Sequence, residues 1–170
     1  MRLNSAISLG LFAPATFLLA ACGSESSGTF SDDDGQTGEY TIDNSTGEAT
    51  ATITTEDGTA TMRSGADVPV DLPGGFTPYP GGEVVANTVV KQGEGSGTLL
   101  TMTTSDDPDT VAAFYKAQAE AAGIEIQMEM TTNGGKMVGG ESSEGLTFSI
   151  IASPTAGGTS AQLAVGSSVD

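Results

Sequence analysis

The stretch DPDTVAAFYKAQAEAAGIEIQMEM, residues 107–130, decides the fold, because it joins an amphipathic helix directly to an alternating strand. Asp107 suits the N-cap position and Pro108 the first helical position, and apolar residues then recur at helical spacing until Gly123 ends the helix. From Ile124 to Met130, apolar residues alternate with Glu and Gln. This alternation predicts a strand that turns its apolar residues inward and its acidic face to water.

Segments with strand-like patterns lie on both sides of this stretch. Two precede the helix, with a glycine-rich turn between them, and three come after the alternating strand. The order of two strands, a helix and a run of antiparallel strands predicts an α+β fold, with the helix packed on one face of an antiparallel sheet. The flanking segments are residues 83–91, 98–104, 136–138, 146–151 and 161–165.

A second β-rich segment precedes this module. Residues 40–67 are rich in Thr and carry a hairpin signal at Glu56-Asp57-Gly58, which predicts a small β-meander. Such a meander buries little by itself, so we expect it to pack against the α+β module or to extend the sheet of that module. Residues 68–82 contain four prolines and form an extended connector between the two.

Several of these features resemble a module of uncharacterised bacterial lipoproteins. The residues that carry the resemblance are Tyr79-Pro80-Gly81, then Phe114-Tyr115 in the helix, then Gly123 before alternating strands. The resemblance covers residues 68–167 and departs from the module at Ile124, where such modules often carry Trp. It implies an α+β fold and no particular activity.

The amino terminus resembles the signal of a bacterial lipoprotein. Arg2 is followed by an uncharged apolar run, which is too short for a transmembrane span, and then by Leu19-Ala20-Ala21-Cys22. Leu19 with two small residues before the only cysteine is similar to a lipobox, in which cleavage falls between Ala21 and Cys22. The resemblance implies that the Cys22 thiol carries the lipid. The alternative is an ordinary secretory signal, cleaved after Ala21 or Cys22, that leaves a free thiol.

These patterns divide the chain into four parts. We predict a signal peptide over residues 1–21, a lipidated cysteine with a disordered acidic linker over 22–39, the small β-meander over 40–67 and the α+β domain over 68–170. Gly23 stands where many Gram-negative lipoproteins carry an Asp retention signal. In a Gram-negative cell we therefore expect attachment to the periplasmic side of the outer membrane.

Composition narrows the function. The formal net charge of −17 and the position of every acidic residue after Cys22 exclude binding of nucleic acid, or of an anionic bilayer surface, through charge. The acidity fits solubility, adaptation to salt, or a cationic partner. The chain has no histidine, which excludes a Ser-His-Asp or Cys-His site and histidine metal ligands. No cofactor is indicated.

Three groups of side chains are candidates for a site. Phe114 and Tyr115 are either pocket residues or core residues at helical spacing. The carboxylates at the helix start are either a cation site or helix caps. The methionines of the last strands are candidate soft-metal ligands, although alternation with acidic residues favours an inward core position for Met128 and Met130. The carboxylates are Asp106, Asp107 and Asp109, and the methionines are Met128, Met130 and Met137.

The leading functional hypothesis is a membrane-anchored, non-catalytic envelope lipoprotein with a structural or protein-interaction role. Its partners are the membrane, through Cys22, and another envelope protein. The alternative is a small-solute or cation-binding lipoprotein, with the ligand held between helix and sheet. A hydrolase with paired carboxylates is a third and weaker hypothesis, since the domain is small for such a cleft.

Overall fold

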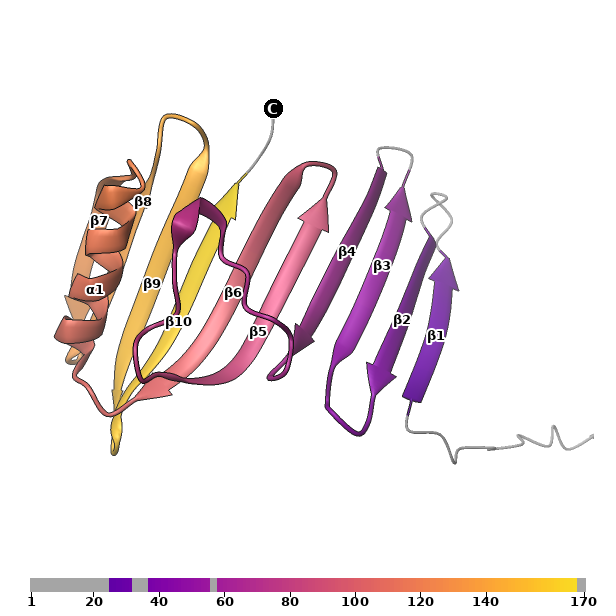
Figure 1. Ribbon diagram of the computed structural model, residues 1–170, viewed down its shortest axis with the longest axis horizontal. Coiled ribbons are helices and arrows are strands. Elements are labelled where there is room, and N and C mark those ends of the chain that lie inside the picture. Colours follow the sequence, from indigo (N-terminus) through magenta and orange to yellow (C-terminus); the bar gives the residue numbers. More distant parts are fainter. Residues whose placement is uncertain (1–24, 32–36, 56–57, 168–170) are drawn as a thin grey trace, which may run out of the picture.

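The computed structural model describes residues 25–31, 37–55 and 58–167, which form an antiparallel sheet with an α-helix on one of its faces (Figure 1). The strands are β1 (Glu25–Ser31), β2 (Thr37–Asp43), β3 (Ala49–Thr55), β4 (Gly58–Gly65), β5 (Glu83–Gln92), β6 (Gly95–Thr104), β7 (Glu125–Thr132), β8 (Gly135–Glu141), β9 (Leu146–Thr155) and β10 (Gly158–Ser167). The helices are the 3₁₀ turn η1 (Pro73–Gly75) and α1 (Pro108–Ala121).

The order of the strands places β10, the last of the described strands along the chain, in the middle of the sheet. The order is β1-β2-β3-β4-β5-β6-β10-β9-β8-β7, so β1 to β6 follow one another as a meander. The chain then crosses one face as α1 and starts again with β7 at the opposite edge. It returns strand by strand until β10 pairs with both β6 and β9. Strand β10 therefore joins the two halves of the sheet, and the core between them needs this strand.

Helix α1 begins and ends where the sequence predicts. The carboxylate of Asp107 accepts a hydrogen bond of 2.9 Å from the backbone N–H of Thr110, which lowers the pKa of that carboxyl. Gly123 comes after the helix with a positive φ of 77°, a conformation that glycine adopts at no steric cost. These two signals fix the length of the helix.

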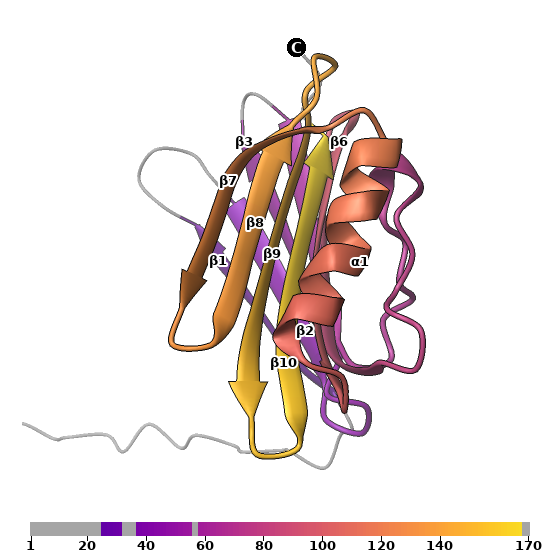
Figure 2. The ribbon, with the colours of Figure 1, turned by 90° about the vertical axis from the view of Figure 1, so that its left-hand side faces the viewer.

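The core lies between the sheet and the elements that cover it. Helix α1 packs on β7, β8, β9 and β10, while η1 packs on β6 and β10. Figure 2 shows α1 and the connector (residues 68–82) on the same side of the sheet. We call this side the covered face. Its fully buried large side chains include Leu100, Met102, Val111, Tyr115, Ile150 and Leu163.

The predicted fold class, an α+β module preceded by a small β-meander, is wrong, whereas the expectation that the meander extends the sheet of the module is confirmed. Strand β4 pairs with β5 from Ala60↔Gln92 to Gly65↔Asn87, so one ten-stranded sheet runs through both parts. The fold is dominated by this antiparallel sheet, with one α-helix among the described residues. The connector did break the hydrophobic pattern, but its prolines lie outside the strands and leave the ladder between β4 and β5 intact.

The prediction of disorder across residues 22–39 also differs from the structure. Residues 25–31 form β1, and residues 37–39 open β2, with Phe30 opposite Gly38 in the ladder. Acidic residues and serines in this segment suggested a solvated coil. The backbone instead pairs with β2, whose own apolar residues alternate.

The predicted orientation of β7 holds for Ile126, which packs against the core, but is wrong from Met128 onward. Its ladder with β8 shifts register between Ile126 and Met128, which marks a β-bulge that leaves Gln127 as the extra residue. A shift of one residue turns every later side chain to the opposite face. Met128 and Met130 consequently face away from α1, and Glu129 faces it. The Lys116 ammonium of the helix lies 2.6 Å from the Glu129 carboxylate.

Candidate interaction surface

The sheet face opposite α1, which we call the open face, gathers most of the exposed apolar side chains. Eleven large apolar side chains are exposed among the described residues. Ten of them occupy open-face positions in the strand registers. The eleventh, Val85, lies at the register shift in β5. The ten are Phe30, Tyr40, Ile42, Ile53, Met62, Val90, Leu99, Met128, Met130 and Ile151.

Charge is nearly absent from the open face. Among the described strand positions on this face, only Glu83, Glu125 and Glu141 are charged, and each lies at the end of its strand. The other open-face positions hold apolar residues, glycine, serine, threonine or glutamine. In a chain with 22 acidic residues this distribution is distinctive. An uncharged apolar surface of this extent is typical of a protein-interaction site.

Large and small residues alternate on the open face of β1 to β4. In one row of the ladder, Phe30 and Ile53 alternate with Gly38 and Ala60. The next row reverses the order. In it, Gly28 and Ala51 alternate with Tyr40 and Met62. The rings of Phe30 and Tyr40 lie over the glycines opposite them, in the space that a Cβ on Gly38 or Gly28 would need. The face is therefore flat over β1 and β2 and finely corrugated over β3 and β4.

We call strands β1 to β4 the extension. Within the described part of the chain, no second layer covers β1, β2 and β3, and the connector reaches only β4. Figure 1 shows α1 and the connector over the β5–β10 part of the sheet and neither of them over β1, β2 or β3. Of the residues in these strands whose exposure is described, only Gly38 is buried. A sheet with one apolar face is stable when that face is covered. The extension therefore presents the surface that most lacks a partner.

The predicted pocket residues lie in the core. Tyr115 is fully buried, and its hydroxyl donates to the sulfur of Met102 at 3.3 Å. Phe114 packs edge-on against both Tyr115 and Tyr79, at ring-centre distances of 5.1 Å in each case. These rings fill the space between α1, the connector and the sheet. The same contacts make Phe114 and Tyr115 structural residues and do not favour a ligand at that place.

The acidic residues at the helix start have partners within the protein. Asp106 accepts a hydrogen bond of 2.5 Å from the hydroxyl of Tyr79, which raises the pKa of Tyr79 to about 12. Asp107 caps the helix, and Asp109 lies 2.9 Å from the ammonium of Lys136. Within the described ranges no group of three or more acidic, cysteine or histidine side chains is placed to hold a metal ion.

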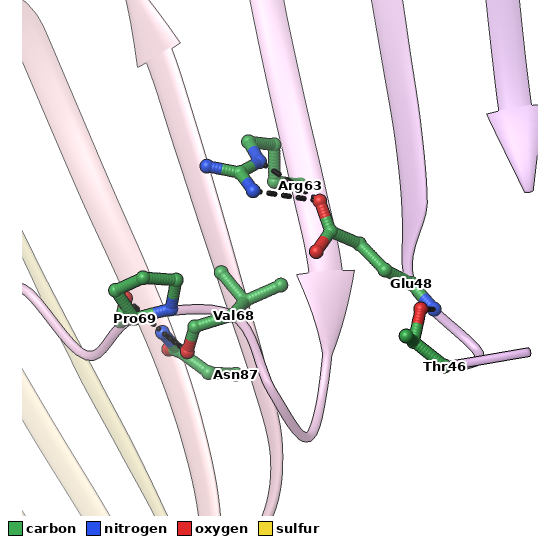
Figure 3. A network of polar contacts seen from close by, with 6 residues as sticks. All are labelled: Thr46, Glu48, Arg63, Val68, Pro69 and Asn87. Carbon is green, nitrogen blue, oxygen red and sulfur yellow. Dashed lines mark hydrogen bonds and ion pairs between the residues drawn. The ribbon is translucent and has the colours of Figure 1, made fainter. Parts of the chain in front are cut away.

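A hollow lined by both basic and acidic side chains lies where the connector leaves the extension. Arg63 and Lys91 line a hollow of about 250 Å³ together with Asp71. Arg63 is bound to Glu48, with its Nη2 2.7 Å from the carboxylate (Figure 3). Because Glu48 pairs with Arg63 and Asp71 lines the same hollow, the hollow offers little net positive charge to an anion.

The same region anchors the connector to the sheet. The buried side-chain amide of Asn87 donates to the carbonyls of Val68 at 3.3 Å and Pro69 at 2.9 Å (Figure 3). Thr98 likewise donates to the carbonyl of Asp71 at 2.9 Å. These side chains supply donors to carbonyls of the connector, which is not itself paired in the strand ladder. They hold the connector on the covered face and leave the open face free.

Residues Ala21 and Cys22, predicted as the cleavage and lipidation sites, lie outside the described residues. No helix within residues 25–31, 37–55 and 58–167 is long and apolar enough to span a membrane. The soft-metal candidates Met128, Met130 and Met137 all lie on the open face, with Met130 directly opposite Met137. Sequence reasoning missed this face, although the alternation of Ala, Ile and Met with Thr in β3 and β4 could have indicated it.

Part of the chain is similar to a known protein family. Residues 84–162 match the family model described as START domain-like. The match covers the part of the sheet that carries α1, from β5 into β10, and leaves the extension outside. No curated protein and no solved structure matches the chain significantly.

Proposed function

We propose that the protein is a lipid-anchored envelope lipoprotein that binds another protein through the open face of its sheet, without catalysis. The main support for this proposal is the open face. It carries ten exposed large apolar side chains, and its three glutamates lie at strand ends. The lipobox-like Leu19-Ala20-Ala21-Cys22 supports the anchor. The match to the START domain-like model concerns the covered part of the sheet and names no ligand.

The anchor would hold the extension close to the membrane. Strand β1 begins at Glu25, three residues after Cys22. Consecutive Cα atoms are about 3.8 Å apart, so Glu25 lies within about 11 Å of a lipidated Cys22. The sheet edge formed by β1 would then lie beside the bilayer, without the long linker predicted over residues 22–39 between them. Two or three acyl chains, as such lipoproteins carry, give stable attachment.

A photo-crosslinking amino acid at position 99 tests the docking role in intact cells. Leu99 is 44 % exposed at the centre of the open face, so we expect this variant to give discrete crosslinked products. Ala117, which is exposed on the outer side of α1, is the matched control and is expected to give none of them. Equal products from both positions, or none from position 99, would contradict the proposal.

The anchor is tested separately by metabolic labelling with a palmitate analogue. We expect the wild-type chain to take up the label and the Cys22→Ser variant to lose it. Equal labelling of both chains would end the lipoprotein assignment but would leave the docking role of the open face untouched.

A further inference from the structure

A partner of the open face matches it best with a surface that is also uncharged and that fits its alternating large and small residues. A partner that recognised this protein by charge would meet the acidic residues, which lie elsewhere on the chain, and would find almost none on the open face. Recognition there depends on apolar contact and shape. Among the described residues, the open face itself has these properties, so a second copy of the chain offers a matching surface.

Charge also restricts how two copies can meet. Each copy carries a formal net charge of −17, so most contacts between copies place carboxylates against carboxylates. Stacking the open faces avoids this, since Glu83, Glu125 and Glu141 lie at strand ends. The arrangement of charge therefore selects one geometry for self-association and disfavours the others.

The shape of the face suits sheet-on-sheet packing. Two stacked sheets lie about 10 Å apart and interdigitate their facing side chains. On β3 and β4 the large residues Ile53 and Met62 stand beside Ala51 and Ala60, so large side chains of one copy can enter the gaps over alanine in the other. A two-fold axis makes this exchange reciprocal, as an isologous interface requires.

The available area is sufficient for a stable contact. Ten strands about 4.8 Å apart, each about seven residues long at about 3.3 Å per residue, give a face of roughly 1,000 Å². A standard interface buries about 800 Å² on each partner. Strands β1 to β3, which no second layer of the described chain covers, would gain one from the second copy.

We propose that two copies of the protein stack through their open faces, related by a two-fold axis that runs across the strands between the two sheets, and so form a sandwich. This inference rests on the proposed role of the open face as a docking surface and names its partner. Side-by-side anchoring in one membrane would favour the contact, because both copies carry the anchor next to β1.

Cysteine crosslinking in intact cells tests the sandwich. Ala51 and Thr52 are neighbours at the centre of β3 and point to opposite faces, so Ala51→Cys and Thr52→Cys form a matched pair. With a bis-maleimide that spans about 10 Å, we expect most of the Ala51→Cys chain in a band of twice the monomer mass. Thr52→Cys and the wild type, which retains Cys22, are expected to stay at the monomer mass.

A second substitution separates a specific contact from proximity in the membrane. Met62→Lys places a charge in the stacked face and is expected to abolish the dimer band of Ala51→Cys, while Met62→Leu preserves it. Products of Ala51→Cys that contain only other proteins would overturn the second copy as partner and keep the docking role. The absence of any product from both Ala51→Cys and the photo-crosslinker at position 99 would overturn both proposals.

Discussion

Replacing Gly158 by alanine should destabilise the protein by about 3 kcal/mol, one of the largest effects expected of any single methyl group in this chain. Gly158 opens β10 with a φ of 135°, which L-residues rarely adopt. A Cβ at this position would also collide with the carbonyl oxygen of Thr104 and with the backbone of Ser105. Because β10 joins the two halves of the sheet, a displaced hairpin weakens both the β6 and the β9 ladders.

Gly157 supplies the control for this prediction. It is the preceding residue in the same turn, and a Cβ there meets no atom within 4 Å. Urea denaturation of Gly157→Ala and Gly158→Ala should therefore give a nearly unchanged free energy of unfolding for the first and a strongly reduced one for the second. Equal values for the two variants would show that the β9–β10 turn does not have the described backbone.

Replacing Leu100 by alanine should reduce the free energy of unfolding by about 2–5 kcal/mol, as is usual for a buried leucine. Its side chain is fully buried on the covered face, in register with Leu163. Leu99, its neighbour in sequence, faces the other way and is 44 % exposed in the single chain. Leu99→Ala should lower the stability of the isolated chain by less than about 1 kcal/mol.

The pair of leucines tests the assignment of the two faces. Both substitutions change a leucine to alanine at adjacent positions of β6, so the change in strand propensity and the atoms removed are the same in both variants. Thermal and urea unfolding of the dilute protein should separate them clearly. A large loss of stability for Leu99→Ala and a small one for Leu100→Ala would mean that β6 is in the opposite register.

The local elements of this fold could be predicted from the sequence, since local chemistry determines them. Asp107 and Gly123 mark the ends of α1, and the alternating patterns of β5, β6 and β7 to β10 are visible in the chain. Pairing between strands that are distant in the sequence is harder to predict, because many strands with similar patterns could pair with the same neighbour. Nothing in residues 58–65 specifies that β4 continues the sheet at β5.

One β-bulge explains why the faces of the later β7 residues were predicted wrongly. A period-two pattern assigns sides only while the register is regular, and the bulge at Gln127 reverses the assignment for Met128 and Met130. After the bulge Glu129 faces the helix and contacts Lys116, whereas Glu125, before the bulge, lies on the open face. The sequence contains no strong signal for this bulge.

The candidate surface was harder to predict than the fold. Its large residues come singly from strands that also carry alanine, glycine and threonine, so no segment of the extension looks strongly amphipathic by itself. The surface forms when Phe30, Tyr40, Ile53 and Met62 are brought side by side by the ladder. Phe114 and Tyr115, which do stand out in the sequence, lie in the core.

Methionine oxidation footprinting in native envelopes is the most direct test of the docking role. Met62, Met128 and Met130 are 41 %, 41 % and 49 % exposed in the single chain, whereas Met102 is 1 % exposed under α1. If the open face is a docking surface, the first three should oxidise more slowly in intact envelopes than in the purified, highly diluted protein, with Met102 slow in both. Equal rates for Met62, Met128 and Met130 in the two preparations would contradict the account.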